Sequence, residues 1–344
     1  MRLRTVLSAA VCLVAGLAAV ALPAGPGRAQ DLKEINVLLP NPSAINVFPL
    51  WVAIGEGYFE KEGLAVNVEA VDGSSQVLQA MSAGQAQIGL PGPGPVMAAN
   101  ARGVNVVFIY NHFAKSVFGL VVREEAAHQT PADLKGTTIG VGTADGAEVS
   151  FTRAILNDLG MVEGTDFTFL PVGDGGLAAA AFERGDVESY AAAVSDAAIM
   201  SARGLKVREI TPEAYLAYFG NGYAALRSYI DENPEVIEGF GRALVRGVEF
   251  GMDPANEAKV LEHTTAGNPQ EGEDKAFAAA LLASIKGRVT PFDPSKGWGY
   301  QPPEHWELWH KSEVAAGALS EPLPDLTKVY TNEFIAGWNE GAMQ

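Results

Sequence analysis

Short apolar runs that alternate with amphipathic segments dominate the first two thirds of the chain. Apolar residues at every second position indicate a half-buried strand, and a spacing of three to four residues indicates a helix. The predicted strands are 35–39, 64–71, 87–90, 104–110, 118–123, 138–141, 167–171, 188–192, 207–210 and 222–226. The predicted helices are 48–57, 74–83, 95–102, 146–159, 176–184 and 196–203, with a capped turn at 130–133. Strands and helices in this order are typical of a mostly parallel sheet covered by helices.

The order of strands and helices restarts near Phe118, so the sequence predicts two α/β lobes. The rest of the chain is almost entirely helical, with helix starts predicted at Asn233, Asp253, Pro302 and Thr331. With 48% hydrophobic residues and 38 glycines among 344, the composition is that of a folded chain with many tight turns. We therefore expect an α/β protein with two lobes and a helical C-terminal tail.

The first 29 residues have the pattern of a secretory signal peptide. Arg2 and Arg4 precede an apolar run at 6–22, and the small residues Gly27 and Ala29 form the expected cleavage site. The alternative is a membrane anchor, for which a run of 17 residues is short against a hydrocarbon core of about 30 Å. No later stretch approaches 18 apolar residues, so we expect the exported chain to be soluble.

Cysteine content and charge exclude several classes of function. The single cysteine, Cys12, lies in the predicted signal, so disulfides, thiol nucleophiles and cysteine-bound metals are excluded from the exported chain. The full chain has a formal net charge of −17. Removal of the signal takes away three arginines and leaves 21 basic against 41 acidic residues, a charge of −20. Nucleic acids and anionic membranes require a cationic surface, so neither is an expected partner.

Five loops are rich in the glycine, serine and backbone N–H groups that bind small solutes. In open α/β sheets, ligands bind beyond the carboxyl ends of the parallel strands, where helices begin. The five loops are 40–47, 73–76, 91–95, 142–146 and 173–176. A single loop of this kind more often only turns the chain, but five at corresponding positions in two lobes favour a shared ligand cleft.

Four segments match family signatures. Residues 57–64 fit the pattern G-x-F-x-x-x-G-L, and residues 80–89 fit A-x-x-x-G-x-x-D-I-G with Gln87 in place of the usual Asp. Residues 133–141 resemble D-L-K-G-K-x-I-G-V, and residues 182–188 resemble L-x-x-G-x-V-D-A. In these motifs the chain resembles the periplasmic substrate-binding proteins that serve ABC importers of taurine, alkanesulfonates, nitrate and thiamine pyrimidines.

The resemblance covers about residues 35–203 and implies the type II periplasmic-binding-protein fold, whose two lobes are joined by two crossovers. The implied parts are a first lobe at 31–120, a second lobe at 121–221, and a return to the first lobe with C-terminal helices at 222–344. The strands 118–123 and 222–226 would be the crossovers. The resemblance also implies a periplasmic monomer without a cofactor. Such a protein captures a small solute by lobe closure and delivers it to an inner-membrane permease with a cytoplasmic ATPase.

Polar residues in the five loops and nearby strand ends are the candidate ligand contacts. They are Asn41, Ser43, Asn46, Ser74, Ser75, Gly92, His112, Thr143, Asp145, Gly146, Asp174 and Asp196. Ser74 or Ser75 is also the predicted N-cap of its helix. For each aspartate the alternative is a helix N-cap that points away from the ligand, and for His112 it is a place on the surface.

Aromatic residues near the same loops are candidates for one wall of the cleft. They are Phe48, Trp51, Tyr110, His112 and Phe113. For Phe48 and Trp51 the alternative is packing in the core, because both lie on an apolar helix. For these two residues core packing is the favoured interpretation.

The charges of the loops bear on the class of ligand. The candidate loops contain aspartates and no Lys or Arg, which favours a solute with an amine or N–H donors, such as a pyrimidine, a flavin-like ring or taurine. A sulfonate, nitrate or aromatic acid would have to be held by N–H and hydroxyl groups. An enzyme on the same fold, such as the related thiamine-precursor synthase, is disfavoured, because the cysteine-rich motif that this synthase requires is missing from the exported chain. A sensor that docks on a membrane receptor stays open as an alternative.

Overall fold

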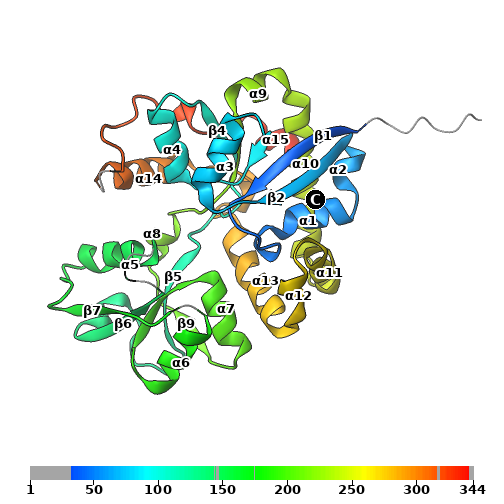
Figure 1. The fold of residues 1–344 in the computed structure, drawn as a ribbon. Helices are drawn as coiled ribbons and strands as arrows, with labels where there is room; N and C mark the ends of the chain where they lie inside the picture. The colour runs from blue at the N-terminus through cyan, green and yellow to red at the C-terminus, as the bar shows by residue number, and fades with distance from the viewer. Residues whose placement is uncertain (1–31, 143, 145–146, 174, 316–317, 341–344) are drawn as a thin grey trace, which may run out of the picture. The chain divides into compact units, whose positions relative to one another are not determined.

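Two five-stranded sheets with helices packed against them make up the described part of the chain (Figure 1). The structure is a computed structural model and describes residues 32–142, 144, 147–173, 175–315 and 318–340. The predicted signal peptide, 1–29, lies outside these residues. The predicted α/β class, with a helical C-terminal part, is confirmed.

The first sheet has the strand order β2-β1-β3-β10-β4. Strand β1 (Lys33–Leu39) pairs in parallel with β2 (Leu64–Ala70) and β3 (Ile88–Gly89). Strand β10 (Tyr223–Leu226) runs antiparallel between β3 and β4 (Val106–Tyr110). Strands β3, β4 and β10 are buried throughout or nearly so, as expected of strands covered on both faces.

The second sheet has the order β7-β6-β8-β5-β9. Its strands are β5 (Phe118–Arg123), β6 (Thr137–Val141), β7 (Phe167–Pro171), β8 (Ser189–Ala193) and β9 (Val207–Glu209). Strand β6 is parallel to β7 and β8, and β5 is antiparallel to β8 and β9. Both sheets are therefore mixed, because β5 and β10, the strands that enter from the other sheet, run against their neighbours.

Eight of the ten predicted helix starts lie within two residues of the start of an observed α-helix, whereas those at Asp253 and Thr331 precede α11 and α15 by four residues. The helices that follow the strands are α1 (Phe48–Gly55), α2 (Tyr58–Lys61), α3 (Gly73–Ser82), α4 (Pro93–Ala101), α5 (Ala147–Asp158), α6 (Gly176–Arg184), α7 (Val194–Ala202) and α8 (Glu213–Leu216). The C-terminal helices are α9 (Arg227–Glu232), α10 (Pro234–Met252), α11 (Glu257–Gly267), α12 (Pro269–Glu273), α13 (Lys275–Val289), α14 (Pro303–Ala315) and α15 (Ile335–Trp338). The predicted N-cap of α3 was wrong: Asp72 occupies that position, so Ser74 and Ser75 lie in the first turn.

Helix α10 covers the first sheet with a continuous apolar face. Ile237, Phe240 and Leu244 are fully buried in one cluster with strand residues such as Ile35. Gly247 lets α10 approach α1 closely, since an added Cβ there would lie 2.2 Å from the Pro49 carbonyl oxygen.

Helix α13 contacts elements that belong with both sheets. Leu281, Leu282 and Ile285 pack in one cluster with Phe48 of α1 and Ala198 of α7. A second link is ionic, because Arg288 of α13 donates to both carboxylate oxygens of Glu209 on β9, at 2.8 and 2.9 Å. No local pattern in the sequence indicates that this helix reaches the second sheet.

The two connections between the sheets run side by side. They are residues 111–117, between β4 and β5, and residues 210–222, between β9 and β10. The Phe113 N–H donates to the Asn221 carbonyl at 3.0 Å, and the Gly220 N–H donates to the Phe113 carbonyl at 2.9 Å. Ser116 N–H likewise donates to the Leu216 carbonyl at 2.9 Å. The chain thus changes sheets just before each predicted crossover strand, and β5 and β10 are sheet members.

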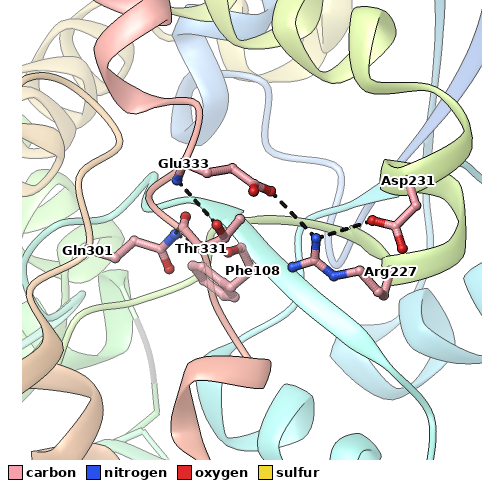
Figure 2. Close-up of polar contacts among 6 residues, drawn as sticks. All are labelled: Phe108, Arg227, Asp231, Gln301, Thr331 and Glu333. Atoms are coloured by element: carbon pink, nitrogen blue, oxygen red, sulfur yellow. Dashed lines mark hydrogen bonds and ion pairs between the residues drawn. The ribbon is translucent and has the colours of Figure 1, made fainter.

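The C-terminal segment adds to the free edge of the first sheet (Figure 2). Phe108 of β4 accepts a hydrogen bond from Thr331 N–H at 3.0 Å, and Gln301 Nε2 donates to both the Phe108 and Thr331 carbonyls, at 3.0 and 2.8 Å. Arg227 lies 3.5 Å from the carboxylate of Glu333. These contacts cover β4, which would otherwise expose an unpaired strand edge.

Candidate functional site

Two adjoining cavities are lined by loops from both sheets. The first, here called the polar cavity, has a volume of about 130 Å³ and is lined by residues after β1 and by Ser195 of α7. The second, here called the aromatic cavity, has a volume of about 490 Å³ and is lined by residues of α4, α5, α8 and α14. Val117 and Asn221, from the two connections, line both cavities. The connections therefore form the boundary between the cavities.

The loop after β1 brings three predicted contacts to the polar cavity, namely Asn41, Ser43 and Asn46. Asn41 Oδ1 accepts the Ser43 N–H at 3.1 Å, which closes a tight turn. Ser43 Oγ accepts the Asn46 N–H at 3.3 Å and donates its own hydrogen to Glu271 at 2.5 Å. Asn46 Oδ1 is buried and has no hydrogen-bond partner among the described residues. Asn46 Oδ1 is thus an acceptor without a donor among the described residues, whereas the Ser43 hydroxyl is hydrogen-bonded within the protein.

Glu271 of α12 fixes this loop. Its carboxylate accepts the N–H groups of Ala44 at 2.8 Å and Ile45 at 3.1 Å, besides the Ser43 hydroxyl. These amides precede α1, so the charge also interacts favourably with the N-terminal end of that helical segment. These N–H groups, which could otherwise donate to an anionic ligand, are therefore engaged by a carboxylate of the protein. Sequence reasoning missed Glu271, because it is 228 residues from Ser43 and no motif marks it.

His112 contacts two residues that line the polar cavity, Asn46 and Phe113. It is buried, and its ring packs edge-on against Phe113 and Tyr223. Nε2 lies 2.7 Å from the Asn46 carbonyl, which can only accept, so the hydrogen of the neutral ring is on Nε2. Burial lowers the pKa of His112 to about 4, against a smaller opposing effect of this hydrogen bond. His112 therefore orients the β1 loop as a neutral donor and does not lie on the surface.

Ser74 and Gly92 link the loops after β2 and β3. Ser74 Oγ accepts the Gly92 N–H at 3.0 Å, and Gly92 lines the aromatic cavity. Ser75 lines a third cavity, of about 770 Å³, between α3 and α4. The two serines thus have different surroundings, although both were predicted as ligand contacts at the start of one helix.

Asp196 uses its carboxylate to join two loops of the second sheet. It accepts the N–H of Ala193 at 3.0 Å, at the start of α7, and that of Gly175 at 2.9 Å, before α6. This is the helix-capping role considered as the alternative for each aspartate. The other predicted contacts from this sheet lie outside the described residues; they are Thr143, Asp145, Gly146 and Asp174.

The walls of the aromatic cavity come from residues that were not predicted. Phe151 of α5 lies edge-on to Tyr215 of α8, with ring centroids 6.2 Å apart. Tyr215 stacks on Tyr218 at 6.1 Å, and Tyr218 meets Trp309 of α14 edge-on at 5.3 Å. Phe118 of β5 continues the series at 6.1 Å from Phe151. All five line the cavity, so it presents a nearly continuous aromatic surface.

The predicted aromatic wall is largely part of the core. Phe48 is fully buried, and Tyr110 packs against Tyr223 and Trp338. Trp51 packs at the margin of the same core cluster. Phe113 alone among the predicted aromatic residues lines one of the two cavities, the polar one. The aromatic residues at 215, 218 and 309 that line the aromatic cavity are visible in the sequence, but they lie outside the glycine-rich loops.

Among the described lining residues of both cavities, Glu313 of α14 has the only formal charge. Burial raises the pKa of its carboxyl group. No cluster of three potential metal ligands occurs among the described residues. Within the same residues, none of the helices has the length and apolar character needed to cross a membrane. The arrangement fits non-covalent binding of an organic solute with a ring.

Two mixed sheets, joined twice and flanking these cavities, define the periplasmic-binding-protein class of fold. A solved structure of the aliphatic sulphonate binding protein SsuA from Escherichia coli is similar, with a TM-score of 0.65 at 17% identity over 91% of this chain and 99% of that one. The family model described as NMT1/THI5 like matches residues 44–258, more than half of the chain. The chain belongs to that family.

Two curated proteins are similar along most of their length. The riboflavin-binding protein RibY of Chloroflexus aurantiacus is 25% identical over 324 residues, which cover 93% of this chain and 91% of RibY. A formylaminopyrimidine-binding protein of Halalkalibacterium halodurans is 24% identical over 294 residues, covering 81% of this chain and 84% of that protein. Both relatives are named as binding proteins.

Proposed function

We propose that this protein is the extracytoplasmic solute-binding component of an ABC importer and that it captures a small ring-containing solute in the two adjoining cavities. It acts by binding and release and makes or breaks no bond. The two curated relatives, named for riboflavin and formylaminopyrimidine, both bind nitrogen-containing rings and support this class of solute.

The aromatic cavity is the observation that carries the proposal. Its volume of about 490 Å³ lies within the range of about 300–1,000 Å³ that is usual for small-molecule sites. Its walls come from α4 and α14, which pack with the first sheet, and from α5 and α8, which accompany the second. A planar ring between such walls would gain both apolar burial and favourable ring–ring geometry.

The place of action follows from the fold class and the predicted signal. The similar sulphonate-binding protein SsuA is named as periplasmic, and the predicted signal peptide at 1–29 would direct export by the general secretory route. We propose a periplasmic monomer that delivers its solute to an inner-membrane permease driven by a cytoplasmic ATPase. The strongly acidic composition favours neither nucleic acid nor an anionic membrane as a partner.

The test is thermal unfolding of the exported chain with a panel of solutes. The panel contains riboflavin, an aminopyrimidine, taurine, an alkanesulfonate, nitrate and an aromatic carboxylate. A ligand at 100 times its Kd adds about 2.7 kcal/mol of stability, which raises the midpoint by several degrees. The variant Tyr218→Ala, which removes one ring of the aromatic wall, should lose most of that increase.

A second measurement separates a wrong panel from a wrong proposal. Native mass spectrometry of the protein, purified from the periplasm of the organism that produces it, would reveal a co-purified solute that the panel omits. If no solute raises the midpoint and none co-purifies, the role in solute capture is refuted. If a solute binds wild type and Tyr218→Ala equally, capture stands but the aromatic cavity is not the site.

A further inference from the structure

Glu313 is a carboxylate without a described partner on the wall of the aromatic cavity. Its side chain is partly buried, and within the described residues no hydrogen bond or ion pair engages its carboxylate. It is the single charged group on a wall otherwise formed by aromatic rings, glycine, proline and small polar residues. A carboxylate accepts hydrogen bonds and donates none at neutral pH.

The place of the Glu313 carboxylate is set by a glycine. Its oxygens lie against the backbone of Gly94 in the first turn of α4, where an added Cβ would stand 2.7 Å from Oε1 and 3.2 Å from Oε2. The backbone of Gly94 does not have a left-handed φ angle, so the conformation itself does not require glycine. Gly94 therefore leaves room for the carboxylate to lie between the start of α4 and the cavity.

Two other features of the cavities favour a ligand with N–H donors over an anionic ligand. Asn46 Oδ1 is a buried acceptor without a described partner, and the amides before α1 are already engaged by Glu271. None of the described lining residues of either cavity is Lys or Arg. The described lining of these two cavities thus includes an unpartnered acceptor and a carboxylate, and it includes no cationic side chain that could pair with a sulfonate or carboxylate.

We propose that Glu313 is the specificity-determining residue of the solute site and selects planar rings that carry a protonated nitrogen or an N–H donor over rings that carry an anionic group. This inference rests on the proposed function and names the class of solute. The ring lies among Tyr215, Tyr218 and Trp309, and its N–H group donates to the Glu313 carboxylate. Burial disfavours the charged carboxylate and so raises its pKa, and an N–H donor or a cation from the ligand would offset this desolvation cost.

The experiment uses two probes with the same ring and opposite charge, 1-naphthylmethylamine and naphthalene-1-sulfonate. Their Kd values for the exported chain are measured by isothermal titration calorimetry at pH 7.5. The amine should bind at least about tenfold more tightly than the sulfonate, because a hydrogen bond to a charged group is worth a tenfold change or more. Glu313→Gln should weaken amine binding by about tenfold and leave sulfonate binding unchanged or stronger.

Two further variants separate charge from position. Glu307→Gln changes the net charge equally on the same helix at an exposed site and should leave both Kd values unchanged. Gly94→Ala keeps Glu313 but displaces its carboxylate, so it should weaken amine binding while the protein stays folded. A Tyr218→Ala variant reports whether the probe occupies the aromatic cavity at all.

Each other result overturns the inference. If the sulfonate binds as tightly as the amine, Glu313 does not determine specificity, and solute capture still stands. The same conclusion follows if Glu313→Gln leaves the Kd of the amine unchanged while Tyr218→Ala weakens amine binding. Wild type that binds neither probe at millimolar concentration refutes selection of ring amines by this cavity. Solute capture itself fails only if the panel and the co-purified material also show no ligand.

Discussion

Replacement of Glu271 tests whether a carboxylate far away in the sequence holds the β1 loop. The carboxylate accepts three hydrogen bonds, from Ser43 Oγ and from the N–H groups of Ala44 and Ile45, over 2.5–3.1 Å. Ala44 and Ile45 are each only 1% exposed, so water cannot readily replace the carboxylate at their amides. In Glu271→Ala these two donors lose their acceptor.

The expected cost follows from those two amides. A buried donor left without a partner costs about 1–3 kcal/mol, so Glu271→Ala should lower the free energy of unfolding by about 2–6 kcal/mol. Glu271→Gln keeps a carbonyl oxygen that can accept both amides and loses only the charge, which should cost about 1 kcal/mol. Glu273→Ala is the matched control, since Glu273 is exposed on the same short helix, and its change should stay within about 0.5 kcal/mol.

Urea unfolding monitored by tryptophan fluorescence gives the midpoints of the three variants, and an unchanged slope permits their comparison. Solute affinity of Glu271→Gln should fall as well, because the loop that carries Asn46 is less firmly positioned. The reasoning is refuted if Glu271→Ala unfolds at the same urea concentration as Glu273→Ala. It is also refuted if the Ala and Gln variants are equally destabilised, because the acceptor oxygen would then not matter.

Three other results are expected. Burial lowers the pKa of His112 from 6.5 to about 4, so the contribution of the neutral ring to the free energy of unfolding is full above about pH 6.5 and falls by about 3 kcal/mol as the pH drops to 4. The difference in free energy of unfolding between wild type and His112→Gln should therefore narrow on acidification, and a constant difference would contradict this. A double-mutant cycle of Arg288→Met and Glu209→Gln should give a coupling of about 0.5–1 kcal/mol that shrinks in 1 M salt, whereas additive effects would show that the ion pair contributes nothing. Gly247→Ala should lower stability by about 1–3 kcal/mol, because its Cβ would meet the backbone of α1. Gly287→Ala in α13, where nothing lies within 4 Å, should raise it by up to about 1 kcal/mol; thermal unfolding that ranks the two alike would refute the packing argument.

The elements that the sequence predicted best are those whose signals are local. Strands Phe118–Arg123 and Phe167–Pro171 and helix Gly176–Arg184 have the predicted bounds. The capped turn near Thr130 is also present, with the Thr130 N–H donating to Asp133 at 2.8 Å. Each of these depends on residues within one turn or one strand, so the pattern of neighbours was sufficient.

Features that depend on distant residues could not be predicted in this way. The mixed sheets arise because β5 and β10 pair with strands far along the chain, and a single run of apolar residues does not show its direction. The reach of α13 to α7 is likewise a property of packing between residues such as Leu281 and Ala198. Local periodicity shows which face of an element is buried, but not against which partner.

The candidate site shows the same limit at the level of single groups. Ser43, His112 and Asp196 have the chemistry expected of ligand contacts, but each is hydrogen-bonded within the protein, to Glu271, Asn46 and the amides before α6 and α7. A loop sequence states which donors and acceptors are present and leaves open which of them are already satisfied. We propose that ligand recognition falls to groups left without a partner in the described structure, among them Asn46 Oδ1 and the Glu313 carboxylate beside the aromatic wall. Both are acceptors, so under this proposal the solute supplies the donors.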